Sequence, residues 1–483
     1  MPAIPLLAHL TAWAERAPGD PAAQQGDEVW STGELLRQAD VTAHLLQRHG
    51  VRAGDRVAWH GGSSLDFAAV LLATWRLDAT YVGINPRYTD REVRDVLART
   101  SPAVVLTPSS LRDARRRTDA AALPAALPEP RGDRPALLVF TTGSTGRPKV
   151  AVLPHRGIAA ASATQAAAMR SHARRTINAL PANHIGGIVN ITTATWWAHE
   201  TVDFVPVFSP AAIIERLNAT SDVRLAAVPM LFQRCLEAPD FAAAARGRLV
   251  HALSGGAPLP ATVCERLRAL DVTVQGMYGQ SEVCGSVCFT GLQDDTATTC
   301  DTVGWPVPGM ELRLGPLDGS AGAGDEGEVQ VRGAQLFTHY LDDPGATRAA
   351  VTADGWLRTG DLGARRPDGA LRLTGRLKEL INTGGHKVMP GEVERVLMAH
   401  PQVATAVVLG TPDAAFGETV AAAIVTRDGR SAEWPVLERW CRDQLANYKV
   451  PKRWMQVDAL PLLGVGKVDR QALTAQLTAN THD

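Results

Sequence analysis

Lysine is scarce in this sequence of 483 residues, in which six of the 49 basic residues are lysines and the other 43 are arginines. All six lie within or after a segment rich in glycine, serine and threonine: Lys149, Lys378, Lys387, Lys449, Lys452 and Lys467. A compact ammonium and a planar guanidinium are not interchangeable. We therefore expect the few lysines to include positions at which the difference matters for function.

A strong net charge, a metal-binding cysteine set and a long apolar run are also missing. The formal net charge of −1 gives no reason to expect nucleic acid or an anionic membrane as a partner. The six cysteines form no paired CxxC set, which argues against zinc. No apolar run reaches transmembrane length, and the N-terminus lacks the basic region of a signal peptide. These absences predict a cytoplasmic protein that spans no membrane.

Helical and strand-like patterns alternate along the first third of the chain. Residues 34–46 and 67–75 have helical spacing, and short apolar runs at 56–59 and 104–106 resemble strands. Strands separated by helices predict doubly wound parallel α/β sheets. The N-terminal pattern predicts an amphipathic helix that docks on the core through Leu6, Leu7, Leu10 and Trp13.

The later part of the chain has a different pattern. Turns and short strands over residues 304–309 and 327–333 predict a β-rich subdomain, and two strands and a helix after residue 402 predict a small α+β domain. A chain of this length is too long for one core and suggests two or three domains.

The most informative segment follows an apolar, strand-like run at residues 136–140. It consists of Thr141, Thr142, Gly143, Ser144, Thr145 and Gly146, and is closed by Pro148 and Lys149. Glycines permit close backbone approach to a phosphate, and hydroxyl and amide groups donate hydrogen bonds to it. The GxxxxGK[ST] pattern of nucleotide P-loops is not met, and Pro148 argues against a helix directly after the last glycine. The segment predicts either a phosphate loop of another kind or a flexible linker.

The segment TTGSTGRPK resembles the signature loop of the adenylate-forming superfamily, which comprises acyl-CoA synthetases, adenylation domains and luciferases. Further segments resemble motifs of that family in the family's order, and they extend over essentially the whole chain: LPANHIGG at 180–187, SGGAPL at 254–259, GMYGQSE at 276–282, TGD at 359–361, GRLK at 375–378 and GKVDR at 466–470. The departures are mild, with Val150 and Ser281 at positions where relatives usually have Gly and Thr.

The resemblance implies a site for ATP and Mg²⁺. The loop Thr141–Gly146 and Lys149 would hold phosphates, Asp361 and Arg376 the ribose, and Glu282 and Thr142 the metal. The segments around adenine and the α-phosphate would be Gly255, Gly256 and Ala257 on one face, and Tyr278, Gly279, Gln280 and Ser281 on the other. A carboxylate suits a hard cation, and an aromatic ring suits a base.

The resemblance also implies roles for the carboxylic acid and for a mobile lid. His184 would lie against the substrate carboxylate, although a lone histidine is also typical of a cap or a core. Lys467 would bridge the carboxylate and the α-phosphate. An N-terminal domain of residues 1–376 would be followed by a lid of residues 377–483 with its hinge at Lys378. The lid would present Gly384, Gly385 and Lys387 to the pantetheine tunnel, although Gly-Gly is also a common hairpin turn.

The implied activity is ATP-dependent formation of an acyl-AMP with release of pyrophosphate, followed by transfer to a thiol. Coenzyme A is the first choice of acceptor, and a separate carrier protein or an amine is the alternative. A competing hypothesis is a regulator that binds ATP without turnover. A kinase is a further alternative, and it would release ADP instead of AMP. Monomer and homodimer are both compatible with the sequence.

The acyl pocket is expected along residues 184–197, 228–232 and 255–285. Apolar side chains in these stretches favour an aliphatic or aryl acid over a dicarboxylate: Trp196, Trp197, Met230, Phe232, Met277 and Val283. Such side chains are also common in protein cores.

Overall fold

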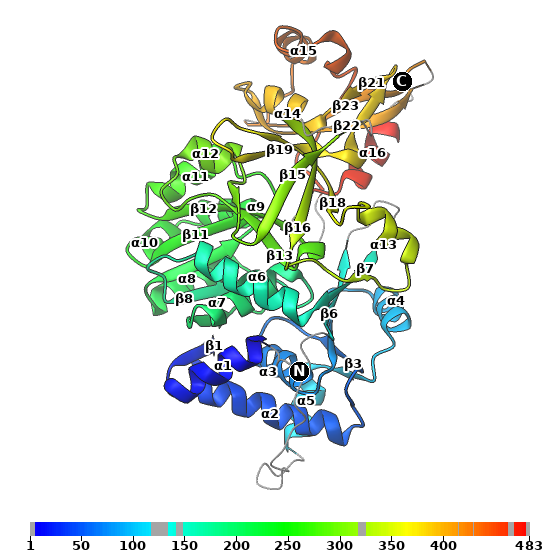
Figure 1. Ribbon diagram of the computed structural model, residues 1–483. Coiled ribbons are helices and arrows are strands. Elements are labelled where there is room, and N and C mark those ends of the chain that lie inside the picture. Colours follow the sequence, from blue (N-terminus) through cyan, green and yellow to red (C-terminus); the bar gives the residue numbers. More distant parts are fainter. Residues whose placement is uncertain are drawn as a thin grey trace. The chain divides into compact units, whose positions relative to one another are not determined.

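The computed structural model describes residues 5–116, 134–141, 148–316, 325–413, 415–427, 429–461 and 468–479. The chain divides into two compact units, Met1–Leu312 with Val331–Leu357, and Arg313–Gln330 with Arg358–Asp483 (Figure 1). The predicted boundary between residues 376 and 377 lies inside the second unit. The lid domain and its hinge at Lys378 therefore remain predictions.

The first unit contains a large sheet with the strand order β14-β13-β12-β11-β10-β8-β9-β1-β2. Its parallel strands are β1 (Pro21–Gln25), β8 (Arg175–Asn178), β9 (Thr201–Phe204), β10 (Val223–Ala227), β11 (Leu249–Gly255) and β12 (Thr273–Gln280). The strands at the two edges run antiparallel to their neighbours: β2 (Glu28–Ser31), β13 (Gly285–Phe289) and β14 (Trp305–Pro306). The parallel interior agrees with the predicted α/β architecture.

A second sheet of this unit has the order β17-β7-β6-β4-β3-β5. The parallel strands are β3 (Arg56–His60), β4 (Thr80–Ile84), β5 (Val104–Leu106) and β6 (Pro135–Thr141). Strands β7 (Lys149–Pro154) and β17 (His339–Tyr340) continue the sheet antiparallel. The glycine-rich segment therefore joins two antiparallel neighbours, β6 and β7. A strand follows it, and no helix begins directly after Pro148, in agreement with the prediction.

Helices cover these sheets, and side-chain caps mark the starts of several. Ser31 accepts a hydrogen bond from the Glu34 N–H at the start of α2 (Thr32–Arg48), and Ser64 caps α3 (Leu65–Arg76) in the same way. The predicted docking helix is confirmed as α1 (Pro5–Arg16), which lies beside α2 (Figure 1) and buries Leu6, Leu7, Leu10 and Trp13. The other α-helices of the unit are α4 (Asp90–Thr100), α5 (Pro108–Arg116), α6 (His155–Ala168), α7 (Ala194–Trp197), α8 (Pro210–Ala219), α9 (Pro229–Glu237), α10 (Phe241–Ala245), α11 (Ala261–Arg268), α12 (Thr296–Asp301) and α13 (Pro344–Ala350).

The second unit contains most of a sheet ordered β15-β16-β18-β19, with β15 (Met310–Gly315), β16 (Glu326–Gly333), β18 (Leu357–Arg365) and β19 (Leu371–Arg376). A further sheet runs β21-β20-β23-β22, with β24 beside β23, and consists of β20 (Ile381–Thr383), β21 (His386–Val388), β22 (Val403–Asp413), β23 (Gly417–Thr426) and β24 (Arg453–Gln456). Helices α14 (Pro390–Met398), α15 (Trp434–Arg442) and α16 (Arg470–Ala479) complete the α+β pattern that the sequence predicts after residue 402. None of the helices in the described ranges is long and apolar enough to span a membrane.

A buried ion pair lies in the core of the first unit. The Arg216 Nε donates to Asp203 Oδ2 at 2.9 Å, and both side chains are almost completely buried. Burial raises the pKa of Asp203, and the hydrogen bond from Arg216 opposes that rise. Loss of one partner would leave an unpaired charge or donor in the core.

We expect Asp203→Ala to lower the free energy of unfolding by about 3–5 kcal/mol, because it leaves the Arg216 guanidinium buried and unpaired. Arg37→Ala is the control, since Arg37 forms an exposed pair with Glu34 and its loss should cost less than about 1 kcal/mol. Urea denaturation followed by circular dichroism measures both. Equal losses of unfolding free energy in the two variants would contradict the assignment of Asp203 and Arg216 as a buried ion pair.

Candidate nucleotide and carboxylate site

The ends of the predicted phosphate loop are held by strand pairing. Thr141 ends β6, Lys149 begins β7, and the two residues are partners in the antiparallel register. The rest of the predicted loop lies outside the described residues: Thr142, Gly143, Ser144, Thr145 and Gly146. The hairpin thus fixes where the loop leaves and re-enters the sheet.

A buried tyrosine connects Lys149 with Glu282. The Lys149 ammonium lies 4.8 Å from the centre of the Tyr340 ring, and the Tyr340 hydroxyl donates to Glu282 Oε1 at 2.7 Å. Burial, followed by the nearby Glu282 charge, raises the pKa of Tyr340, so the hydroxyl stays protonated and remains a donor. The sequence prediction did not include Tyr340.

Pairing between strands explains why Tyr340 reaches this place. It lies on β17, opposite Ala151 of β7, so its ring lies beside the strand that begins with Lys149. The Phe337 N–H donates to the Glu282 carbonyl oxygen at 2.8 Å, which ties the same segment to the motif around Glu282. The rarity of tyrosine, with five in the chain, is the one sequence signal that could have singled it out.

The predicted adenine segments lie at the carboxyl ends of adjacent parallel strands. Strand β11 ends at Gly255, opposite Met277 of β12, and Gly256 and Ala257 are exposed directly after it. A Cβ atom at Gly255 would lie 2.7 Å from Met277 Cγ, so glycine is required for this packing. The carboxyl edge of a parallel sheet is where α/β proteins bind ligands.

Strand β12 carries the other predicted adenine residues, Tyr278, Gly279 and Gln280. Tyr278 is buried, and a Cβ atom at Gly279 would collide with the Gly285 carbonyl oxygen of the neighbouring strand β13. The 3₁₀-helix η3 (Ser281–Val283) follows and places Ser281 and Glu282 directly beyond this strand.

His184 lies on a loop that the neighbouring sheet residues hold in place. Tyr81 Oη donates to the Ala182 carbonyl at 3.0 Å, and Ser63 Oγ donates to the Leu180 carbonyl at 2.5 Å. A Cβ atom at Gly83 would collide with Asn183, so strand β4 can pack against the loop only with a glycine there. The His184 Nδ1 accepts from the Gly186 N–H at 3.1 Å, which fixes the ring at the start of the next helix.

Three of the expected pocket walls pack against other parts of the first unit instead. Trp196 is completely buried and donates from Nε1 to the Ala22 carbonyl at 3.0 Å, while Trp197 stacks on His9 of α1. Phe232 is also completely buried, in an apolar cluster formed mainly by β8, β10, β11 and the helices beside them. The spacing of large apolar residues did not separate core from pocket.

In the second unit, the predicted ribose residues pair with each other. Asp361 on β18 and Arg376 on β19 are register partners, and Arg376 Nε lies 2.9 Å from Asp361 Oδ1. Lys378 follows on the 3₁₀-helix η4 (Leu377–Glu379), and burial, followed by the nearby Arg376 charge, lowers its pKa. The aspartate is buried and the arginine is partly exposed, so the pair forms a fixed polar surface.

The predicted tunnel glycines form the turn of a hairpin between β20 and β21. Gly384 and Gly385 both have positive φ, at +57° and +85°, and they connect the paired residues Thr383 and His386. Lys387 is exposed on β21. Lys467, which we predicted to bridge the carboxylate and the α-phosphate, lies outside the described residues.

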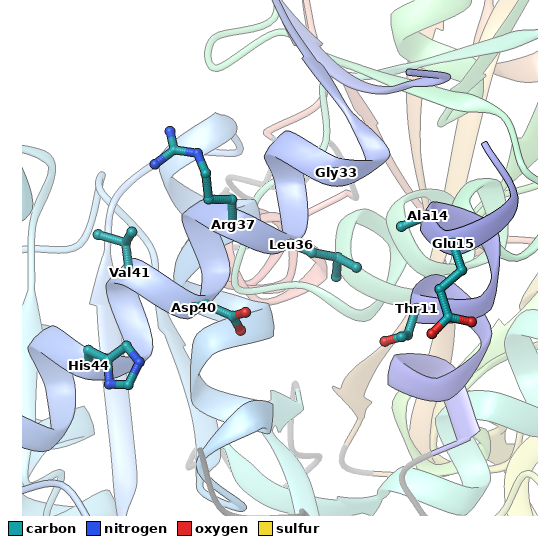
Figure 2. Close-up of a pocket in the computed structure, with 9 residues that line it drawn as sticks. All are labelled: Thr11, Ala14, Glu15, Gly33, Leu36, Arg37, Asp40, Val41 and His44. Atoms are coloured by element: carbon teal, nitrogen blue, oxygen red, sulfur yellow. The ribbon is translucent and has the colours of Figure 1, made fainter. Parts of the chain in front are cut away.

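Within the described parts of the chain, no group of three or more His, Cys, Asp or Glu side chains could hold a metal ion. Mg²⁺ typically binds through one or two carboxylates and the substrate phosphates. Glu282, fixed by Tyr340, fits that requirement. A groove between α1 and α2 contains none of the predicted site residues; Figure 2 shows Leu36 of α2 pointing toward α1.

We expect Glu282→Ala to abolish most Mg²⁺-dependent pyrophosphate release, and Tyr340→Phe to lower kcat/KM about tenfold, or about 1.4 kcal/mol, because the carboxylate loses its fixed orientation. Tyr448→Phe is the matched control, since Tyr448 is an exposed tyrosine of the second unit. A Mg²⁺ titration of initial rates measures all three. Full activity of Glu282→Ala would mean that the metal carboxylate lies elsewhere.

Comparisons with known proteins agree with this geometry. The model of the AMP-binding enzyme family matches residues 10–341, and that of the AMP-binding enzyme C-terminal domain matches residues 392–467. A 4-chlorobenzoate–CoA ligase of Arthrobacter sp is 31% identical over 98% of this chain and 96% of its own length. A feruloyl-CoA synthase of Amycolatopsis sp is 31% identical over 94% of this chain and 95% of its own length. The crystal structure of ATP-bound MatB from Rhodopseudomonas palustris is similar with a TM-score of 0.88 at 28% identity, covering 98% of this chain and 99% of that one.

These similarities confirm the predicted fold and the predicted type of reaction, in which ATP activates a carboxylic acid as an acyl-AMP and coenzyme A accepts the acyl group. The chain therefore belongs to the AMP-binding enzyme family, within the adenylate-forming superfamily, and is an AMP-forming acid–CoA ligase.

Proposed function

We propose that the enzyme acts on an aliphatic or aryl monocarboxylic acid, with Mg²⁺·ATP as the activating nucleotide. The observation that carries the assignment of the site is the contact from Lys149 through Tyr340 to Glu282, which joins the phosphate loop to a buried carboxylate. The two relatives named above act on aromatic acids, chlorobenzoate and ferulate, which supports an aryl acid.

Charge neutralisation is the central demand of the first half-reaction. A carboxylate must attack the α-phosphorus of a triphosphate, so two anions approach each other. In our proposal Lys149 and the loop amides hold phosphate oxygens, Glu282 holds Mg²⁺, and Lys467 bridges the carboxylate and the α-phosphate. Cations fixed where negative charge develops stabilise the transition state without reorganisation.

The adenosine and the acid would be oriented by the other residues. Tyr278 and the backbone of Gly255–Ala257 would enclose adenine, Ser281 would contact the α-phosphate, and Asp361 with Arg376 would bind the ribose hydroxyls. An ionised carboxylate can accept both hydroxyl hydrogens because it has several lone pairs. His184 would lie beside the substrate carboxylate.

The second half-reaction would use a different part of the chain. Rotation about Lys378 would withdraw Lys467 and present Gly384 and Gly385, whose lack of side chains leaves room for the pantetheine arm. The thiol would then displace AMP from the acyl-AMP. A separate carrier protein and an amine are the alternative acceptors.

We also place the enzyme in the cytoplasm. All six cysteines lie in the described parts of the chain and all are free thiols, as expected in a reducing compartment.

Product analysis with Mg²⁺·ATP and a panel of aliphatic and aromatic acids, with and without coenzyme A, tests the function. We expect AMP and pyrophosphate that require one class of acid, and an acyl-CoA only when coenzyme A is present. AMP without a thioester would move the acceptor to a carrier protein or an amine. ADP, or no acid-dependent turnover, would contradict the proposal.

Lys467→Ala should lower acyl-AMP formation at least about 10²-fold, because one of the fixed cations of the transition state is lost. Thioester formation from a supplied acyl-AMP should survive. Lys452→Ala is the control, since Lys452 is an exposed lysine in the same part of the chain. Equal loss of both half-reactions in Lys467→Ala would reject the assignment of Lys467 to the first step alone.

A further inference from the structure

Several amide side chains of the first unit have buried polar atoms without a hydrogen-bond partner among the described residues, and two of these side chains lie close together. They are Gln165 on α6, through both Nε2 and Oε1, and Asn190, through Oδ1. Gln165 is completely buried and Asn190 is 8% exposed. A buried polar atom without a partner costs about 1–3 kcal/mol, so native proteins rarely keep three in one place without a use for them.

The two amides converge on one glycine. A Cβ atom at Gly285 would collide with Asn190 Oδ1 and would lie 2.8 Å from Gln165 Nε2. Gly285 is the first residue of β13 and has a φ of +132°, a conformation that side chains rarely adopt. Glycine at this position therefore lets the donor and the acceptor approach the backbone at the same point.

The helices that carry the amides are fixed against each other. Ser162 Oγ lies 2.7 Å from Thr193 Oγ1, and these hydroxyls are three residues from Gln165 and Asn190 on their respective helices. Asn190 lies in a π-helix, η2 (Gly186–Thr193), which begins two residues after His184. π-Helical segments often occur at functional sites, because they redirect a side chain at a cost in stability.

We propose that Gln165, Asn190 and Gly285 form the polar end of the acid pocket and bind a neutral hydroxyl group of the substrate. This inference rests on the proposed function, with His184 at the carboxylate and these amides at the far end of the acid. A hydroxyl can accept from Gln165 Nε2 and donate to Asn190 Oδ1. A second carboxylate can only accept, and it would place its charge against the amide oxygens. The enzyme is thus specific for a hydroxy acid and discriminates against the dicarboxylate and the unsubstituted acid.

The size of the discrimination follows from desolvation. A site built to hydrogen-bond a substrate hydroxyl rejects the analogue without it by up to about 10⁴–10⁵-fold, because the buried groups of the site are left unpaired. With two amides in contact with one hydroxyl, we expect kcat/KM for the preferred hydroxy acid to exceed that of its deoxy parent by at least about 10²-fold.

The test measures acid-dependent pyrophosphate release for matched pairs: 2-, 3- and 4-hydroxybenzoate against benzoate, 4-hydroxycinnamate against cinnamate, and ω-hydroxyalkanoates against alkanoates. The same pairs are measured with Gln165→Met and Asn190→Leu, which conserve volume and remove the hydrogen-bonding atoms. Each variant should reduce the hydroxy-to-deoxy ratio at least tenfold, through a loss of kcat/KM for the hydroxy acid. Gln444→Met, at an exposed glutamine of the second unit, should leave the ratio unchanged.

The melting temperature separates a binding role from a structural one. If the amides serve the substrate, their replacement by apolar isosteres removes unpaired polar atoms and should raise the melting temperature of the free enzyme. A hydroxy-to-deoxy ratio near one in the natural enzyme, or an unchanged ratio in both variants, would overturn the hydroxyl site. Acid-dependent AMP formation in the same assays would still support the proposed function. Absence of acid-dependent AMP formation with every acid would overturn both.

Discussion

A buried carboxylate, that of Glu282, sets the requirements that the surrounding structure meets. An ionised carboxylate withdrawn from water must be hydrogen-bonded or paired with a cation. Tyr340 supplies the hydrogen bond, and its own position depends on the pairing of β17 with β7. The same strand pairing brings the Lys149 ammonium over the tyrosine ring. One short antiparallel contact thus ties together a cation, a neutral donor and an anion at the edge of the sheet.

The predicted phosphate loop differs in its flanking elements from the strand–loop–helix of P-loop proteins. Its two ends are partners in one antiparallel ladder, Thr141 opposite Lys149, so their separation is about that of neighbouring strands. A strand that begins with Lys149 follows the loop, where P-loop proteins have the N-terminus of a helix. This explains why a proline directly before the lysine is tolerated, since β7 needs no N–H from residue 148 to begin its ladder.

The sequence predicted local features well and distant contacts poorly. The buried face of α1 and the absence of a helix directly after Pro148 follow from residue spacing and from the chemistry of proline, which act over a few residues. Tyr340 was missed because it meets Glu282 across 58 residues of the chain, and no local pattern records that contact.

Apolar and basic residue types were equally ambiguous. Trp196 and Phe232 were interpreted as pocket walls, yet both are core residues, because an apolar side chain has the same spacing in either setting. The scarcity of lysine was informative only in part. Lys449 forms a paired contact with Glu392, 2.7 Å from each carboxylate oxygen, and this contact explains its presence without any role in catalysis.

Because Asn190 lies in the π-helix η2, the direction in which its side chain points depends on the number of residues in this helix as well as on their identity. A π-helical segment contains a residue more than the α-helix it replaces. Deletion of one residue between 186 and 189 would restore α-helical geometry and rotate the side chains on one side of the deletion by about 100° relative to those on the other. In the proposed hydroxyl site, a single-codon insertion or deletion in this helix is therefore a short evolutionary route to a new substrate, because it exchanges the side chain that faces Gly285 without altering the strands beneath it.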